Sequence, residues 1–203
     1  VPSDSPYVYS DCNSASPEVN VLLEAFQDMK IGIIGVGGTG SYILDYVAKT
    51  PVREIHLFDG DYYHNKNAFR APGATHIDSL IKPQRKTDYF AQEYSKIHKG
   101  VVSHPVNIEE DKLNTLNDLS FVFIAVDKSS VKAKIISHLE EQGINFIDVG
   151  MGDHLLNGSI LGHLRTTTST TEKRAHVREN NRIKLTENNV NDYSDLVQIA
   201  ELN

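Results

Sequence analysis

The chain has 203 residues, a formal net charge of −7 and a single cysteine, Cys12. Its length is sufficient for one α/β domain with a sizeable core. The negative charge argues against a nucleic-acid-binding surface, and no apolar run approaches the ~18 residues of a membrane span. One cysteine excludes an internal disulfide and a cysteine-based zinc cluster and indicates a reducing compartment, so we expect a cytoplasmic protein.

The first 29 residues are predicted to form an arm followed by a helix. Residues 1–17 are rich in Ser, Pro and Asp, a composition typical of irregular structure. Glu18–Met29 carries apolar residues at helical spacing, with Ser16 as a plausible N-cap and Pro17 in the first turn. We therefore predict an N-terminal unit over 1–29 and one larger domain over 30–203.

A glycine cluster follows the first predicted strand, the short apolar run at 31–34. It leads directly into Ser41–Lys49, whose apolar residues have helical spacing. Glycines at such a turn allow the backbone to approach a phosphate, and the start of the helix offers unpaired N–H groups to an anion. The pattern predicts a phosphate-binding loop, although a glycine-rich turn without a ligand is the alternative. The predicted loop residues are Gly35, Gly37, Gly38, Thr39 and Gly40.

Polar residues at fixed distances follow the second predicted strand, Glu54–Phe58. Asp59 ends this strand nineteen positions after Gly40, near the spacing expected for a carboxylate that binds a ribose hydroxyl. Asp61 follows, and six and nine residues after it stand Asn67 and Arg70. Together with the glycine loop, this D-x-D and N-x-x-R arrangement resembles the ThiF/MoeB/E1 superfamily. Its members are adenylating enzymes that activate ubiquitin-like proteins and sulfur carriers.

The resemblance implies an ATP site in the domain 30–203, with Asp59 on the ribose and Asp61 beside it. Asn67 would fix a phosphate or a metal-bound water, and Arg70 would neutralise charge on the phosphates. The family also places a lysine at the start of the next helix, predicted here from about Gln84, but Gln84 itself follows Pro83 where lysine is usual. The replacements considered are Lys86, which we favour, then Lys82, with Arg85 also nearby. For each of them, a solvated basic helix end is an equally good interpretation.

Two further parallel strands are predicted at Val101–Ile108 and Phe121–Val126. Asp127 stands at the end of the second, where ligands of open parallel sheets collect. The family has an Asp here, in a D-N-x-x-x-R sequence, that holds Mg²⁺, an ion that prefers oxygen ligands. The alternative role for Asp127 is to cap a helix over Ser130–Gln142, and one carboxylate could serve both.

The last part of the chain is predicted to be antiparallel. A fifth strand, Ile144–Val149, is followed by two alternating segments, Gly158–Thr168 and Lys173–Leu185, which we expect to pair across a Thr-rich turn. The residues from 191 onward resemble the start of a late family helix that is cut short at Asn203. The predicted fold is thus an α/β, Rossmann-like, mainly parallel sheet with helices on both faces and an antiparallel extension at the C-terminal end.

The resemblance implies an ATP- and Mg²⁺-dependent adenylyltransferase. Its partner would be a ubiquitin-like or sulfur-carrier protein ending in Gly-Gly, whose carboxylate is converted to an acyl-adenylate. The residues expected to carry this chemistry are Arg70, Asn67, Lys86 and Asp127. The absence of C-x-x-C pairs favours ubiquitin-like conjugation over sulfur transfer.

Several features depart from the family pattern. Residues 1–30 contain no arginine, although many members supply one from this region across a dimer, so a homodimer is left open. Cys12 lies before the fold and is interpreted as incidental, and the region 153–178 offers no thiol for a thioester step. His154 and His163 are expected to be surface or structural residues. The competing functions are an NAD-dependent oxidoreductase, which leaves Asn67 and Arg70 unexplained, and an inactive E1-like scaffold.

Overall fold

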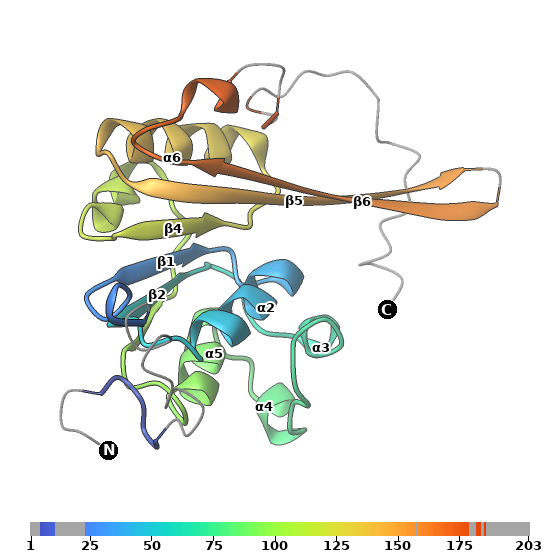
Figure 1. The fold of residues 1–203 in the computed structure, drawn as a ribbon. Helices are drawn as coiled ribbons and strands as arrows, with labels where there is room; N and C mark the ends of the chain where they lie inside the picture. The colour runs from blue at the N-terminus through green and yellow to red at the C-terminus, as the bar shows by residue number, and fades with distance from the viewer. Residues whose placement is uncertain (1–4, 11–22, 157, 179–181, 184, 186–203) are drawn as a thin grey trace.

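The structure, a computed structural model, describes residues 5–10, 23–156, 158–178, 182, 183 and 185, with the backbone alone for 153–156. They form a six-stranded sheet of order β3-β2-β1-β4-β5-β6 (Figure 1). The strands are β1 (Lys30–Ile34), β2 (Glu54–Phe58), β3 (Val101–His104), β4 (Phe121–Ile124), β5 (Asn145–Leu156) and β6 (Ser159–Ser169). The helices are α2 (Gly38–Val47), α3 (Asn65–Ala68), α4 (Asp78–Ile81), α5 (Lys86–Tyr94), α6 (Ser129–Glu141) and the 3₁₀ turns η1 (Glu110–Leu116) and η2 (Ala175–Val177).

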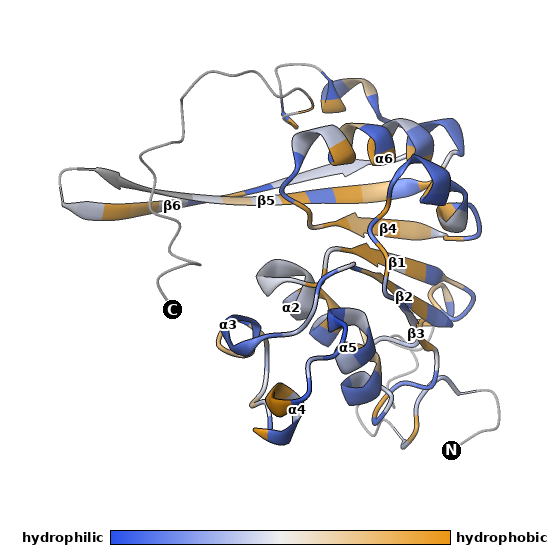
Figure 2. Ribbon diagram, turned by 180° about the vertical axis from the view of Figure 1, so that it is seen from behind, coloured by the Kyte–Doolittle hydropathy of each residue, from blue (hydrophilic) through white to orange (hydrophobic). Residues whose placement is uncertain are grey.

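The centre of the sheet is parallel, with β1 between β2 and β4. Lys30 pairs with Glu54 on one side, and Ile31 pairs with Phe121 on the other. Residues 31–34 are all buried, as expected for a strand covered on both faces. Figure 2 shows the apolar residues concentrated along β1 and β4. The predicted α/β, Rossmann-like fold with an antiparallel C-terminal extension is confirmed.

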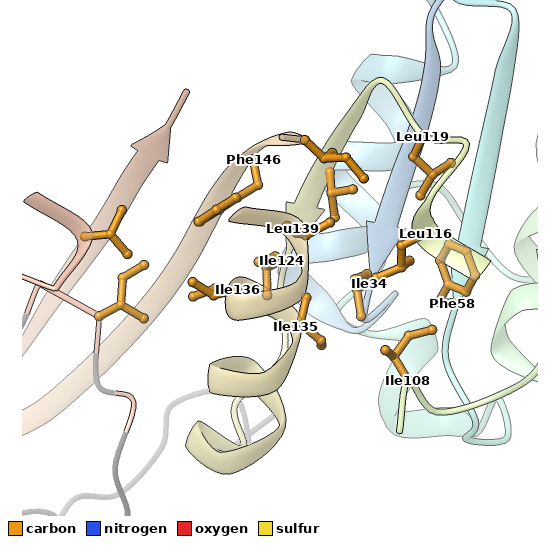
Figure 3. Close-up of a cluster of buried hydrophobic side chains, with 14 residues drawn as sticks. Ile34, Phe58, Ile108, Leu116, Leu119, Ile124, Ile135, Ile136, Leu139 and Phe146 are labelled. Carbon is orange, nitrogen blue, oxygen red and sulfur yellow. The ribbon is translucent and has the colours of Figure 1, made fainter. Parts of the chain in front are cut away.

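Helices cover the two faces of the sheet and enclose two separate cores. On one face, α6 and η1 pack on β1, β4 and β5 through residues such as Ile135, Leu116 and Phe146 (Figure 3). On the other, α2 and α5 contribute Leu44 and Phe90 to a cluster with β1 and β2. Each fully buried side chain of this kind contributes about 1.5–3 kcal/mol, so the two cores hold the strand ends in fixed positions.

The predicted pairing of Gly158–Thr168 with Lys173–Leu185 is wrong. Strand β5 does not end at Val149 but continues to Leu156 and pairs with β6 in antiparallel register, from Phe146↔Ser169 to Leu156↔Ser159. The sequence Asn157-Gly158 connects the strands, and Gly158 has φ +78°, which suits a tight hairpin turn. Because β4 ends opposite Asp148, the hairpin from Gly150 to Arg165 projects beyond the sheet (Figure 1).

The segment after β6 turns back toward α6 instead of forming a strand. Thr170 and Lys173 pair in a tight turn, and η2 follows. The guanidinium of Arg174 donates hydrogen bonds to the carbonyl oxygens of Thr170, Leu139 and Ile144. Leu139 lies in the last turn of α6 and Ile144 lies just after the helix, so Arg174 ties this segment to the C-terminal end of α6.

Other boundaries differ from the predictions by a few residues. Helix α2 begins inside the glycine cluster, at Gly38, and α5 begins at Lys86 because the preceding residue, Arg85, has an extended backbone. Strand β3 stops at His104, before Pro105, which has no N–H to donate. Of the helix predicted at 18–29, the structure describes only the final part, and Ser16, Pro17, Cys12 and residues 191–203 lie outside the described residues. In the part of the chain that is described, no helix is long and apolar enough to cross a membrane.

Candidate functional site

The glycine cluster connects β1 to α2 at the carboxyl end of β1. Gly35 has φ +87°, a left-handed conformation that glycine adopts without steric cost. A Cβ atom on Gly40 would overlap the carbonyl oxygen of Gly35, so the helix can start this close to the strand only with glycine there. At Gly37, by contrast, no atom lies within 4 Å of the position that a Cβ would take. The loop is therefore tightly packed on its inner side and open on its outer side.

Four consecutive backbone amides, those of residues 37–40, lie at the start of α2. Gly37 is the N-cap, and no side chain caps the helix. The flanking amides are paired, since Val36 N–H donates to Asp59 Oδ2 (3.0 Å) and Ser41 N–H donates to the Gly37 oxygen (3.0 Å). No described residue accepts a hydrogen bond from the four backbone amides of residues 37–40. Unpaired amides at the positive end of a helix bind anions, so this arrangement suits a phosphate.

Asp59, Asp61 and Lys86 form an ionic cluster beside the loop. The Lys86 ammonium lies 2.8 Å from Asp61 Oδ2 and 3.4 Å from the Asp59 carboxylate. Asp59 is nearly buried, with a side chain 9% exposed, and also accepts a hydrogen bond from Asp61 N–H (2.9 Å). The Asp61 side chain is 69% exposed, and the hydrogen bond from Lys86 lowers the pKa of its carboxyl. A carboxylate accepts up to about four hydrogen bonds, so Asp59 can take a further donor such as a hydroxyl.

The three cations considered for the phosphates occupy different positions. Two backbone hydrogen bonds hold the start of α5 beside the segment after β2: Lys86 N–H donates to the Asp61 carbonyl oxygen (3.0 Å), and Tyr63 N–H donates to the Gln84 carbonyl oxygen (2.8 Å). The Lys86 side chain therefore reaches the ionic cluster. The Arg85 guanidinium donates to the Gly60 oxygen and lies 4.2 Å from the centre of the Tyr62 ring. Lys82 is exposed and makes no ion pair with a described residue. Only Lys86 of the three therefore contacts the predicted ribose-binding carboxylate.

Asn67 and Arg70 lie in and after the short helix α3. Asn67 is buried, and its Oδ1 accepts a hydrogen bond from His64 N–H (2.9 Å), closing a capping box. No described residue accepts a hydrogen bond from its Nδ2. Arg70 is half-buried, its Nε donates to the Lys66 oxygen (3.3 Å), and its backbone lies about 4 Å from the position of a Cβ on Gly38. The turn capped by Asn67 thus places Arg70 against the glycine loop.

Asp127 is exposed at the same edge of the sheet, three residues after β4. It does not cap α6, whose N-cap is Lys128 without a side-chain hydrogen bond. Within the described ranges, no cluster of three or more His, Cys, Asp or Glu residues is arranged to hold a metal. Mg²⁺ at a nucleotide needs only one or two carboxylates, because phosphates and water supply its other ligands. The exposed carboxylate of Asp127, which forms no ion pair with a described residue, fits that requirement.

Comparison with known proteins identifies the family to which this arrangement belongs. The model of the ThiF family matches residues 16–182, which is most of the chain. The chain belongs to the ThiF family. A tRNA threonylcarbamoyladenosine dehydratase of Haemophilus influenzae is 26% identical to this ThiF-family chain over 135 residues, 63% of the chain and 49% of that protein. The chain thus spans about half the length of the curated relative that it matches.

Solved structures of other proteins have the same fold as this ThiF-family chain. TcdA of E. coli, a tRNA N6-threonylcarbamoyladenosine dehydratase crystallised with ATP, superposes with a TM-score of 0.58 at 22% identity, over 66% of this chain and 61% of TcdA. MccB of E. coli, crystallised with MccA-N7isoASN, gives 0.57 at 20% identity, over 65% of this chain and 39% of MccB. A crystal structure of PaaA also gives 0.57, at 21% identity, over 65% of this chain and 41% of PaaA.

Sequence reasoning missed several polar residues around this site. Asn107 accepts a hydrogen bond from Gly60 N–H (3.1 Å), and so holds the segment between Asp59 and Asp61. No sequence pattern pointed to Asn107, because its contact depends on the packing of the segment after β3 against the end of β2. A second missed group is Asp148 with Lys132 and Arg165. Lys132 stands five residues after Asp127, at the position of the arginine in the D-N-x-x-x-R pattern. That spacing could have singled out Lys132 as a candidate site residue.

Proposed function

We propose that this chain binds ATP over the glycine loop and transfers AMP to a carboxylate, which gives an acyl-adenylate and pyrophosphate. The observation that carries the proposal is the set of four unpaired amides, residues 37–40, with Asp59 and Lys86 on one side and Arg70 on the other. A carboxylate that can accept a hydrogen bond from a ribose hydroxyl, amides suited to a phosphate and two cations occur together at one edge of the sheet. An NAD-dependent oxidoreductase would use the first two but has no role for Arg70.

The roles follow from what this reaction requires. An oxygen of the carboxylate attacks the α-phosphorus, the bond from the α-phosphorus to the bridging oxygen breaks, and pyrophosphate leaves. The acceptor is its own nucleophile, so the protein must mainly position the reactants and stabilise charge on the phosphates. The amides of residues 37–40, Arg70 and Lys86 supply that stabilisation, while Asp59 orients the ribose. Asn67 donates through Nδ2, and Asp127 would hold Mg²⁺, which neutralises phosphate charge when bound.

The carboxylate is proposed to be the C-terminus of a ubiquitin-like or sulfur-carrier protein ending in Gly-Gly. The main support is the sequence resemblance, and the net charge of −7 disfavours a polyanionic acceptor. A second candidate comes from the similarity to a tRNA threonylcarbamoyladenosine dehydratase, which makes a carboxylate carried by tRNA the competing acceptor.

The test is ATP–pyrophosphate exchange by the full chain with purified acceptors. Exchange that requires a small protein with an intact C-terminal Gly-Gly, and is lost when the two glycines are removed, supports the proposal. Exchange with modified tRNA but no such protein assigns the second acceptor. An absence of ATP binding, together with a fluorescence change on addition of NADH, contradicts adenylation. ATP binding without exchange for any acceptor contradicts the catalytic role and favours the scaffold.

A further inference from the structure

A basic hollow lies on the opposite edge of the sheet from the glycine loop. Its cavity of about 310 Å³ is lined by Thr168, Thr170, Lys173, His176 and Arg182. Thr171 N–H donates to Asn145 Oδ1 (2.9 Å), and Asn145 is the first residue of β5, paired with the first residue of β4. The parallel strands thus begin beside this hollow and end at the predicted nucleotide site, so the two sites are separate. In Figure 1 the turn that follows β6 lies at that opposite edge.

The basic residues of the segment 173–182 divide into two groups. Arg174 is occupied by backbone carbonyls at the end of α6, and Arg178 forms an ion pair with Glu140. Lys173 and Arg182 are both exposed, and neither forms an ion pair with a residue that the structure describes. Both side chains line the same cavity. They give the hollow a positive charge.

His176 and two threonines add hydrogen-bonding groups to this charge. The Nε2 of His176 donates to the Thr168 oxygen (2.7 Å), because a carbonyl oxygen can only accept. The remaining ring nitrogen, Nδ1, is buried without a hydrogen-bond partner among the described residues. With the proton on Nε2, Nδ1 of the neutral ring can only accept a hydrogen bond, so its partner in a ligand would have to be a donor such as the P–OH group of a protonated phosphate. The two cations and the threonine hydroxyls are the groups of this hollow that can donate to phosphate oxygens.

We infer that the hollow lined by Lys173, His176 and Arg182 binds a phosphoryl group, either as free phosphate or as the phosphate of a nucleotide. Two cations complement the double negative charge of a phosphate, and the cavity accommodates a ligand larger than the ion itself. Because the hollow and the glycine loop lie on opposite edges, this site does not depend on the proposed adenylation.

The test follows the side-chain resonances of His176 by NMR while the full chain is titrated at constant pH and ionic strength. Inorganic phosphate and AMP are added separately. Saturable shifts with inorganic phosphate identify a free-phosphate site, and shifts with AMP alone identify a nucleotide phosphate. The Lys173→Ala/Arg182→Ala variant should bind the active ligand on the order of tenfold more weakly or worse.

The matched control is Arg53→Ala/Lys112→Ala, which removes the same charge from exposed side chains elsewhere on the protein. It should bind as the wild type does, and both variants should keep the wild-type thermal midpoint. No response of His176 to either ligand would overturn the inference. Equal weakening in the two double variants would also overturn it, because that result indicates a non-specific effect of net charge.

Discussion

Two charge clusters lie on either side of β1 in the sheet and have opposite net charges. In the first, at the ends of β2 and the start of α5, the Lys86 ammonium lies between the carboxylates of Asp59 and Asp61. In the second, Asp148 on β5 lies 2.7 Å from the Lys132 ammonium and 3.0 Å from the Arg165 guanidinium. The first cluster has a formal charge of −1 and the second of +1.

The two clusters differ most in their access to solvent. Asp61 is 69% exposed, so breaking its ion pair with Lys86 exposes the carboxylate to water at little cost. Asp148 has no exposed surface, and the Lys132 side chain is only 6% exposed. Removing Asp148 would leave the Lys132 ammonium where water can hardly solvate it, whereas the Arg165 side chain is 37% exposed. The first cluster therefore keeps one exposed, exchangeable partner beside the proposed nucleotide site, whereas the second cluster fixes the base of the projecting hairpin to α6.

Breaking the buried cluster should have the largest effect. Asp148→Asn leaves two cations without their carboxylate, and we expect a loss of about 3–5 kcal/mol in the free energy of unfolding. Denaturation with urea measures it. Asp127→Asn, a change of the same kind at an exposed carboxylate, is the control and should change the free energy by less than about 0.5 kcal/mol. Equal urea midpoints for Asp148→Asn and the wild type would show that the buried cluster does not stabilise the fold.

Removing charge from the open site should affect catalysis instead of stability. Arg70→Ala and Asp127→Ala should each lower the rate of ATP–pyrophosphate exchange by a factor of about 10² or more, because both groups are proposed to stabilise charge on the phosphates. The thermal midpoints should stay at the wild-type value. If both variants exchange at the wild-type rate, the assignment of these residues to the site is wrong.

Two glycines of the loop allow an effect on ATP binding to be separated from an effect on stability. Gly37→Ala places a methyl group in open space, so the fold should be retained, but the methyl group occupies the proposed position of the phosphates. We expect ATP to bind about tenfold more weakly, which calorimetry can measure. Gly40→Ala creates an overlap with Gly35 and should instead destabilise the protein. Undiminished ATP affinity in Gly37→Ala would place the phosphates elsewhere.

The smallest effect is expected for the exposed member of the first cluster. Asp61→Asn should change the free energy of unfolding by less than about 1 kcal/mol at neutral pH, because the ion pair is exposed to solvent. Lys86 lowers the pKa of Asp61 from its ordinary value of 3.8, so this contribution is present above that pH and is lost as the pH falls below it. Urea denaturation at pH 7 and pH 3 should therefore show a smaller difference between variant and wild type at pH 3. A difference that grows toward pH 3 would contradict the ion pair.

The features that could be predicted from sequence are those encoded over short distances. The loop from Gly35 to Gly40 and the strand that ends just before Asp59 follow from local patterns, and the structure has both. The grouping of Arg70 with the loop required the family resemblance, since it depends on how α3 packs. In the last third of the chain the prediction rested on the Thr-rich segment as the turn and did not use Asn157-Gly158, although Asn-Gly is a strong hairpin signal.

The remaining features depend on contacts between residues distant in sequence. In the sequence, Asp148 interrupts an otherwise apolar strand. The neighbouring residues do not show that Lys132 and Arg165 will neutralise its charge. Asn107 lies 47 positions from Gly60, which its side chain holds. Such pairings are decided by the register of the sheet and by the packing of helices on it, so no local sequence pattern predicts them.

The most direct test of the account is to map a bound nucleotide on the full chain. Titration with a non-hydrolysable ATP analogue, followed by amide ¹⁵N NMR, should give its largest shifts at the amides of residues 37–40, with smaller shifts at Asp59 and Arg70. Largest shifts at any other part of the chain, with the signals of residues 37–40 unchanged at saturation, would contradict the central claim that these amides bind the phosphates.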